Sequence, residues 1–365
     1  MRITVDAIPL LVRSAGVKNY LFHWITHLRR LLGDEQVALF PALHQLAALD
    51  HEGSIASPLG TRARQALFFA LNLRPNHFAD WIAARSDIFH ATKLRYPPRG
   101  PRLTATLHDV TCWLMPEFHQ ADNVAAEKLF AEQIWKPAAG LIAVSENTRR
   151  DAVRVLNLDP NRIRVIHPGV AESFFNAAPS AASRPYALYV GTIEPRKNVD
   201  RLLDAWRSLP ASVRGEFDLV VAGPVGWHAA QTLARLRSPD TAAHGVRYMG
   251  YVPEADMTGL TAGATVFVYP SLYEGFGFPV AQAMAAGVPV ITSNLSSLPE
   301  ITGGAAALVD PRSVAEIGAA LERLLTSPAS REQMAQAGRV QAQRFRWEDG
   351  ARQSVEFFEQ ILGSR

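Results

Sequence analysis

The chain has little cysteine and no long apolar run. Its single cysteine, Cys112, excludes an internal disulfide framework and a metal site built from several cysteines. No apolar run reaches the roughly 18 residues that a membrane-spanning helix needs. The N-terminal residues 1–5 form a strand-like run and lack the pattern of a secretory signal. We therefore expect a cytoplasmic protein whose contact with a membrane is peripheral at most.

Several motifs of nucleotide and metal chemistry are also missing. The sequence contains no G-x-x-x-x-G-K-[ST] loop and no H-E-x-x-H pair, and no two aspartates are separated by a single residue. We therefore expect no metal ion and no other cofactor. A phosphorylated ligand would then have to be neutralised by cationic side chains and helix N-termini.

Charge is unevenly distributed along the chain. The formal net charge of +3 is too small to indicate a nucleic-acid partner. Residues 1–170 carry 20 basic and 15 acidic side chains, whereas residues 171–365 carry 17 and 19. Lysine is rare, and Lys197 is the only lysine of the second half. This rarity favours a functional role for Lys197 over a solvated surface charge.

Short apolar runs alternate with helical patterns along the whole chain. The runs are rich in Ile, Val, Leu and Phe without clean alternation, as in strands that are covered on both faces. They lie at 2–6, 36–40, 88–91, 102–107, 140–144, 162–166, 186–191, 217–222, 246–249, 265–269, 289–293 and 307–309. Helical patterns between and after them include 17–32, 124–136, 146–156, 198–209 and 348–362. This alternation predicts an α/β protein with two doubly wound, parallel, Rossmann-like sheets.

A change of composition suggests where the two domains meet. Residues 172–185 are small and polar and include two prolines, which is typical of a linker. We expect a first domain over 1–171, a second over 186–347 and a terminal helix over 348–365. Two such sheets would face one another across a cleft, with ligands at the carboxyl ends of the strands.

The strongest candidate site lies in residues 269–287, where a strand end is followed by a glycine-containing loop. Pro279 suits the first turn of a helix. Glu274 offers a carboxylate to hydroxyl groups, and Gln282 lies one turn into the helix. An ordinary tight connection with an exposed glutamate would give the same pattern. Four residues supply amides that suit an anion or sugar hydroxyls at the helix N-terminus: Gly275, Phe276, Gly277 and Phe278.

A second candidate site follows the strand at 186–191. Asn198 is placed to cap the next helix, so Arg196 and Lys197 lie at a helix N-terminus, where cations are unfavourable. An anion bound between the two cations would remove that conflict. Alternatively, both are solvated loop charges, but the rarity of lysine favours the functional interpretation.

Two weaker candidates lie in the first half. His108 follows the strand at 102–107 and would face the cleft, although a lone histidine is more often structural. Gly16 follows the first strand, with Lys18 beside it, and would let a ligand approach the backbone. In the loop 111–122, Cys112 is better interpreted as a small buried residue than as a nucleophile.

Taken together, these motifs resemble the retaining glycosyltransferases of family 4, which have the GT-B fold. The carriers are G-T-I-E-P-R-K-N at 191–198, E-G-F-G-F-P-V-A-Q-A-M-A-A-G at 274–287 and L-P-E at 298–300, with weaker support at 106–109 and 165–170. The resemblance covers most of the chain, and it is strongest to bacterial mannosyltransferases of polysaccharide and lipopolysaccharide assembly. It implies that the terminal helix returns to the first domain.

The resemblance also implies roles for individual residues. Lys197 and Arg196 would hold the diphosphate of a nucleotide sugar, and Glu274 would bind hydroxyls of the transferred sugar. His108 would reach that sugar from the first domain. The remaining donor-binding positions would be Gly16, Thr192, Val252, Gly275, Phe276, Gly277, Phe278 and Gln282. GDP-mannose is the donor suggested first, and a saccharide or lipid-linked saccharide is the acceptor.

The sequence departs from the family pattern at two positions. Glutamine stands at 282, where the family has a second glutamate, so only one ribose hydroxyl can donate to it and we expect weaker donor binding. Thr192 replaces a basic residue, which leaves the diphosphate to Arg196 and Lys197. Since no enzymic nucleophile stands near the site, we expect front-face substitution with retention, without a metal ion.

Two other functions are compatible with the same fold. A nucleotide-sugar epimerase would need a second acid or base near the sugar, which we cannot assign. A catalytically silent nucleotide-sugar-binding partner has only Gln282 in its favour. Separately, the segment 60–74 combines arginines with Leu and Phe, which fits either an anionic membrane surface or a core helix with a basic edge.

Overall fold

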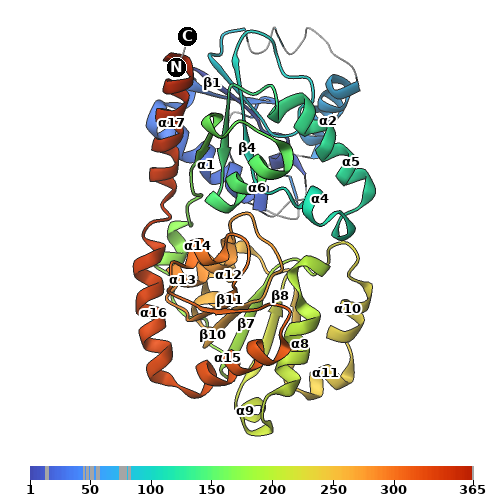
Figure 1. The fold of residues 1–365 in the computed structure, drawn as a ribbon, viewed down its shortest axis with the longest axis vertical. Helices are drawn as coiled ribbons and strands as arrows, with labels where there is room; N and C mark the ends of the chain where they lie inside the picture. Colours follow the sequence, from blue (N-terminus) through green and yellow to red (C-terminus); the bar gives the residue numbers. More distant parts are fainter. Residues whose placement is uncertain are drawn as a thin grey trace. The chain divides into compact units, whose positions relative to one another are not determined.

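The computed structural model describes residues 1–12, 16–43, 46, 49, 53–54, 58–73, 80 and 84–363. The chain forms two compact units, which are drawn in Figure 1. Unit 1 consists of Met1–Leu114, Ala121–Gly169 and Arg346–Arg365. Unit 2 consists of Met115–Gln120 and Val170–Phe345.

Unit 1 is built on a parallel sheet of six strands in the order β2-β1-β3-β4-β5-β6. The strands are β1 (Ile3–Asp6), β2 (Val37–Phe40), β3 (Ile88–Ala91), β4 (Arg102–Leu107), β5 (Gly140–Ala143) and β6 (Ile163–Val165). All four residues of β1, of β3 and of β5 are buried. Side chains on both faces of the sheet are therefore covered, which explains why these strands lack polar alternation.

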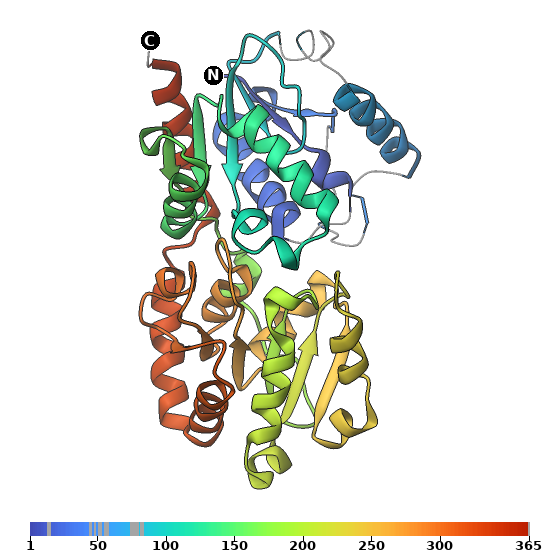
Figure 2. The ribbon, with the colours of Figure 1, turned by 45° about the vertical axis from the view of Figure 1, so that its right-hand side comes forward.

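Helices surround this sheet, and the last one comes from the C-terminus. They are α1 (Gly16–Leu32), α2 (Pro58–Leu73), α4 (Thr111–Leu114), α5 (Ala121–Phe130), α6 (Glu146–Leu156) and α17 (Trp347–Gly363). Figure 2 shows α17 in red along unit 1, where it packs against α1. Trp24 Nε1 of α1 donates a hydrogen bond of 3.0 Å to Ser354 Oγ of α17. The expected return of the terminal helix to the first domain is confirmed.

Unit 2 repeats the architecture with the strand order β12-β11-β10-β7-β8-β9, again all parallel. The strands are β7 (Tyr186–Val190), β8 (Asp218–Ala222), β9 (Val246–Gly250), β10 (Val266–Tyr269), β11 (Val290–Ser293) and β12 (Ala307–Val309). The two doubly wound sheets predicted from the sequence are confirmed, and each of the twelve strands agrees with its predicted range to within one residue at either end.

The helices of unit 2 connect these parallel strands. They are α7 (Glu172–Phe175), α8 (Val199–Ser208), α9 (Ala211–Glu216), α10 (Ala230–Leu236), α11 (Pro239–Ala243), α12 (Glu254–Ala262), α13 (Phe278–Ala285), α14 (Leu298–Thr302), α15 (Val314–Thr326) and α16 (Pro328–Ala342). The segment 172–185, expected as a linker, instead belongs to unit 2 and begins with α7. The physical reason is Phe174, whose side chain is completely buried.

Two neighbouring strands bring the main sequence motifs together. Strand β10 pairs directly with β7 in the sheet of unit 2. The loop after β7 carries the motif at 191–198, and the loop after β10 carries the motif at 274–287. Because parallel strands end at the same edge of a sheet, the two motifs lie side by side.

Candidate active site

Hydrogen bonds from backbone and side-chain amides join the loop after β7 to the loop after β10. The amide of Leu272 donates to the carbonyl of Arg196 at 2.9 Å. Asn198 Nδ2 donates to the carbonyls of Pro270 at 2.9 Å and Pro311 at 2.7 Å. Asn198 occupies the N-cap position of α8, but its side chain makes no capping bond. The predicted capping role is therefore wrong, because Asn198 Oδ1, the atom that would accept a capping bond, instead accepts from Arg201 NH1 at 2.9 Å.

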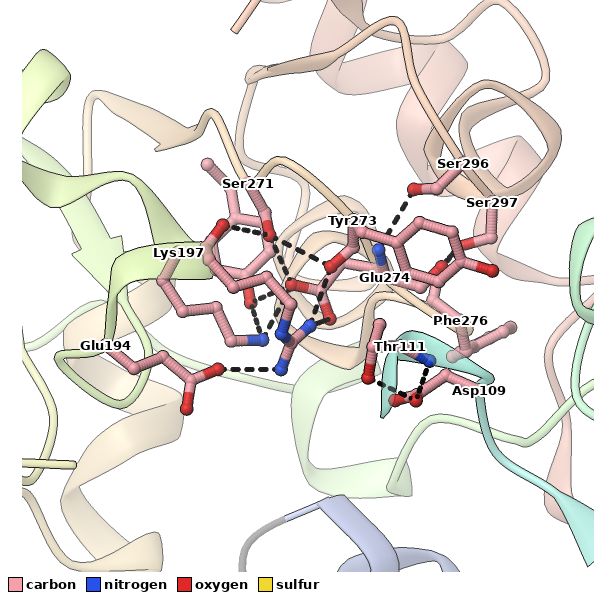
Figure 3. A network of polar contacts seen from close by, with 12 residues as sticks. Asp109, Thr111, Glu194, Lys197, Ser271, Tyr273, Glu274, Phe276, Ser296 and Ser297 are labelled. Atoms are coloured by element: carbon pink, nitrogen blue, oxygen red, sulfur yellow. Dashed lines mark hydrogen bonds and ion pairs between the residues drawn. The ribbon is translucent and has the colours of Figure 1, made fainter. Parts of the chain in front are cut away.

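The carboxylate of Glu274 is the centre of the site (Figure 3). Its Oε1 accepts hydrogen bonds from Lys197 Nζ at 2.6 Å and Ser271 Oγ at 2.6 Å. It also accepts from the hydroxyl of Tyr269 at 2.9 Å. Lys197 Nζ donates in turn to that hydroxyl at 2.8 Å. Glu274 and Lys197 thus form one connected polar network at the ends of β7 and β10.

Arg196 ties the network to a second carboxylate. Its NH2 group donates to Glu194 Oε1 at 2.7 Å. Its NH1 group donates to the carbonyl of Tyr273 at 2.6 Å and lies 3.4 Å from Glu274 Oε2. The predicted proximity of Arg196, Lys197 and Glu274 is present in the structure, and each cation is paired with a carboxylate.

Burial makes these ion pairs strong. The side chains of Lys197 and Arg196 are 12% exposed and that of Glu274 is 10% exposed. Burial alone would raise the pKa of Glu274, but the charges of Lys197 and Arg196 and the hydrogen bonds from Lys197 and Ser271 lower it to about 2. Glu274 is therefore a carboxylate over the whole physiological pH range.

Tyr269, whose hydroxyl belongs to the network, stacks on Tyr189. The rings of Tyr189 and Tyr269 are 5.7 Å apart and nearly parallel. Burial, together with nearby carboxylates, raises the pKa of both phenols well above 10, so both keep their protons. Among the residues that the structure describes, the buried hydroxyl of Tyr189 has no hydrogen-bond partner.

Serine side chains hold the loop that precedes α13. The amide of Glu274 donates to Ser296 Oγ at 3.0 Å. Ser297 Oγ contacts the carbonyls of Glu274 at 3.0 Å and Phe276 at 2.9 Å. Gly277 has φ +102°, a conformation that favours glycine, and it precedes the first turn of α13. These hydrogen bonds hold the loop of Gly275, Phe276, Gly277 and Phe278 at the N-terminus of α13, and its binding of an anion or a sugar stays a prediction.

The other predicted donor residues of unit 2 are Thr192, Val252 and Gln282. Gly191 directly follows β7, and a Cβ there would lie 2.9 Å from the hydroxyl of Tyr189, so a side chain would force that tyrosine to shift. Thr192 and Gln282 are half-buried, and Val252 is buried just after β9. Among the described residues, no hydrogen bond or ion pair joins Gln282 or Val252 to Glu274, so their donor-binding roles stay predictions.

His108, Gly16, Lys18 and Cys112, which the sequence analysis singled out, lie in unit 1. The ring of His108 packs edge-on against Tyr20 at 5.0 Å, and burial lowers its pKa to about 4, so it is neutral at pH 7. Gly16 begins α1 with open space around its Cβ position. Lys18 is completely buried and donates to the carbonyl of Gly53 at 2.6 Å. Burial raises the pKa of Cys112 to about 12, which agrees with a buried, unreactive thiol.

Sequence reasoning assigned no role to several members of the network. Glu194 lies in the motif at 191–198 and Ser271 in the candidate segment 269–287, whereas Ser296 and Ser297 follow the neighbouring strand β11. The available signal was their position: each follows the carboxyl end of β7, β10 or β11, which are adjacent strands of one sheet.

The network could hold a phosphorylated sugar. It offers two cations for an anion, a carboxylate for hydroxyls, and the amides of the loop before α13. Among the described residues, there is no group of three or more His, Cys, Asp or Glu side chains placed to hold a metal ion.

Comparison with known protein families agrees with this geometry. Residues 170–341 match the glycosyl transferases group 1 family, and residues 14–174 match glycosyltransferase family 4. The chain is 35% identical to O-antigen chain mannosyltransferase B of Escherichia coli over 278 residues, 73% of each chain. It is 29% identical to serotype-specific mannosyltransferase WbdA of Escherichia coli over 353 residues, 92% of this chain but only 43% of that protein.

Solved structures share the fold. WaaG, a glycosyltransferase involved in lipopolysaccharide biosynthesis, superposes with a TM-score of 0.68 at 17% identity, covering 99% of this chain and 100% of that one. Anabaena HepE in complex with UDP gives a TM-score of 0.69 at 17% identity, with the same coverage. Identities this low support the GT-B fold alone.

Proposed function

The chain belongs to the group 1 and family 4 glycosyltransferases, and from that premise we propose that it transfers mannose from GDP-mannose to a saccharide or lipid-linked saccharide acceptor. The proposal includes retention of anomeric configuration and independence of a metal ion. Mannose is supported by the names of two relatives, an O-antigen chain mannosyltransferase and a serotype-specific mannosyltransferase. Family membership favours transfer over the epimerase and silent-partner alternatives.

The observation that carries the proposal is the Lys197–Glu274–Arg196 network. Lys197 and Arg196 would hold the diphosphate and stabilise the negative charge that grows on it as the bond to the sugar breaks. Glu274, ionised by its partners, would accept hydrogen bonds from sugar hydroxyls and face the positive charge that develops on the sugar. The leaving phosphate oxygen would accept the proton of the acceptor hydroxyl.

Transfer by the purified protein tests this proposal. GDP-mannose, UDP-glucose and ADP-glucose are each supplied with a mannose-terminated oligosaccharide, with EDTA present, and the new linkage is assigned by NMR. We expect an α-linked product from GDP-mannose alone. A β-linkage would contradict retention, activity that returns only with Mg²⁺ would contradict metal independence, and transfer from another donor would contradict mannose.

We also propose that α2 touches an anionic membrane surface. Among the described residues, no helix is both long enough and apolar enough to cross a bilayer. Leu71 of α2 is buried and Phe68 packs on the core, whereas Leu59 is 81% and Phe69 is 68% exposed. Arg62 is exposed on the same helix, which carries no acidic residue in its range 58–73. Arg74, the last residue of the segment 60–74, lies outside the described residues. A helix with an apolar outer face and basic residues suits anionic lipid.

Vesicle co-sedimentation tests the α2 proposal. We expect binding to vesicles that contain phosphatidylglycerol, and a clear loss of binding in Phe69→Ser. The matched control is Val340→Ser, which changes a residue of unit 2 that is 70% exposed. Equal binding of both variants and the unchanged protein would contradict a role for α2.

A further inference from the structure

The proposed function gives no role to Glu194, a buried carboxylate of the same network. It follows β7 and precedes the 3₁₀ turn η6 (Pro195–Lys197). Its side chain is only 2% exposed, less than that of any other charged member of the network. Among the residues that the structure describes, its side chain forms an ion pair with Arg196 alone, at 2.7 Å. Figure 3 shows Glu194 at the edge of the network, joined to it through one carboxylate oxygen.

Glu194 makes the network electrically neutral. The two cations, Arg196 and Lys197, are balanced by Glu274 and Glu194 through the three ion pairs of the network, at 2.6–3.4 Å. Glu274 has a function in the proposed mechanism because it faces the sugar. Glu194 adds a negative charge beside a cation proposed to bind a diphosphate, in a place where water screens it little. This placement opposes tight binding of an anion.

We propose that Glu194 is an affinity-setting counter-charge that keeps the binding of the nucleoside diphosphate product weak enough for release. This inference rests on the proposed function. Interactions that hold substrate and product equally tightly do not speed the chemical step, and product release often limits turnover. A counter-charge on Arg196 reduces this uniform attraction, while Lys197 and the loop amides remain to stabilise the leaving group.

The competing explanation is that Glu194 only orients Arg196. The two explanations predict opposite signs for Glu194→Gln. Glutamine keeps the shape and can still accept a hydrogen bond from Arg196 through its carbonyl oxygen, but it carries no charge. A counter-charge role predicts tighter binding of a nucleoside diphosphate. An orienting role predicts unchanged or weaker binding.

Calorimetric titration with GDP, and with UDP and ADP in parallel, tests the proposal. We expect E194Q to bind GDP about tenfold more tightly than the unchanged protein at low ionic strength, and this gain should shrink at high salt. Product inhibition by GDP should strengthen to the same extent. The matched control is Glu322→Gln on α15, which removes an exposed carboxylate of the same unit and should leave GDP affinity within about twofold.

The outcomes separate this inference from the proposed function. Unchanged or weaker GDP binding by E194Q, or an equal gain in E322Q, would overturn the counter-charge role. If the unchanged protein binds none of the three nucleotides, the proposed function itself fails. Thermal unfolding verifies that E194Q is folded. The salt dependence of GDP binding to the unchanged protein gives a result that needs no variant: a shallow slope supports a neutral site, and a steep one contradicts it.

Discussion

Replacing Lys197 by methionine should destabilise the protein in a way that depends on pH. Methionine is an unbranched side chain one atom shorter than lysine, and it removes the charge that lies 2.6 Å from Glu274. In the variant, burial would favour the protonated form of Glu274, with Arg196 at 3.4 Å as the remaining charged partner. The pKa of Glu274 in the folded variant should therefore rise from about 2 towards or above its ordinary value.

The size of the effect follows from the pKa. Lowering the pKa of Glu274 from 4.5 to about 2 corresponds to about 3 kcal/mol of stability at neutral pH. This stability is present above pH 4.5. As the pH falls from 4.5 to 2, it is lost, because the unfolded chain binds the proton first. The free energy of unfolding should therefore differ by about 3 kcal/mol between unchanged protein and Lys197→Met at pH 7, and by about 1 kcal/mol at pH 3.

Urea denaturation followed by circular dichroism at pH 7, 5 and 3 measures this difference. The control is Lys136→Met, which removes the partner of Glu132 in an ion pair whose side chains are 46% and 61% exposed. That exposed pair should contribute at most about 1 kcal/mol. A difference for Lys197→Met that stays the same from pH 7 to pH 3, or that equals the control, would refute the reasoning.

Three further substitutions test the surroundings of the network. Tyr189→Phe should raise the free energy of unfolding by about 1 kcal/mol, because it removes a buried hydroxyl with no partner among the described residues; a loss of stability in urea denaturation would contradict this. Gly191→Ala should lower the thermal midpoint, because its Cβ would lie 2.9 Å from the Tyr189 hydroxyl, and combining it with Tyr189→Phe should restore part of the loss. Gln282→Glu should tighten calorimetric GDP binding about fivefold, because a carboxylate can accept from both ribose hydroxyls; unchanged affinity would remove Gln282 from the donor site.

The strands could be predicted well from the sequence because their signal is local. The run Tyr186–Val190 is continuous and apolar, and strand β7 covers it. Strand β10 likewise covers an apolar run, and the loop and helix predicted after it are present. Because strand ends in a parallel sheet share one edge, locating the two strands was enough to bring Lys197 and Glu274 together.

The features that the sequence did not predict depend on contacts between residues far apart in the chain. Lys18 is buried against the carbonyl of Gly53, 35 residues further along the chain, although lysine is usually exposed. Asn198 Nδ2 donates to the carbonyls of Pro270 and Pro311, and Pro311 is 113 residues away. Phe174 turns a segment with the composition of a linker into part of unit 2. No local pattern carries information about these contacts.

Glu194 is the member of the site network whose role could not be predicted from the sequence. The sequence places it two residues before Arg196 in a loop, where a glutamate is usually a solvated charge. Its burial depends on the close approach of the loops after β7 and β8, where the amide of Ile193 donates to the carbonyl of Pro224 at 2.9 Å. Only the folded structure shows that the carboxylate neutralises Arg196.

The rate of mannosyl transfer by Glu274→Gln, compared with its affinity for GDP, tests the central claim most directly. Glutamine preserves the shape of the side chain but removes the carboxylate that Lys197 and Arg196 hold ionised. We predict that transfer from GDP-mannose slows at least about 10²-fold, while GDP binding is retained or strengthened. Transfer at the unchanged rate by a folded Glu274→Gln protein would contradict the assignment of this network as the active site.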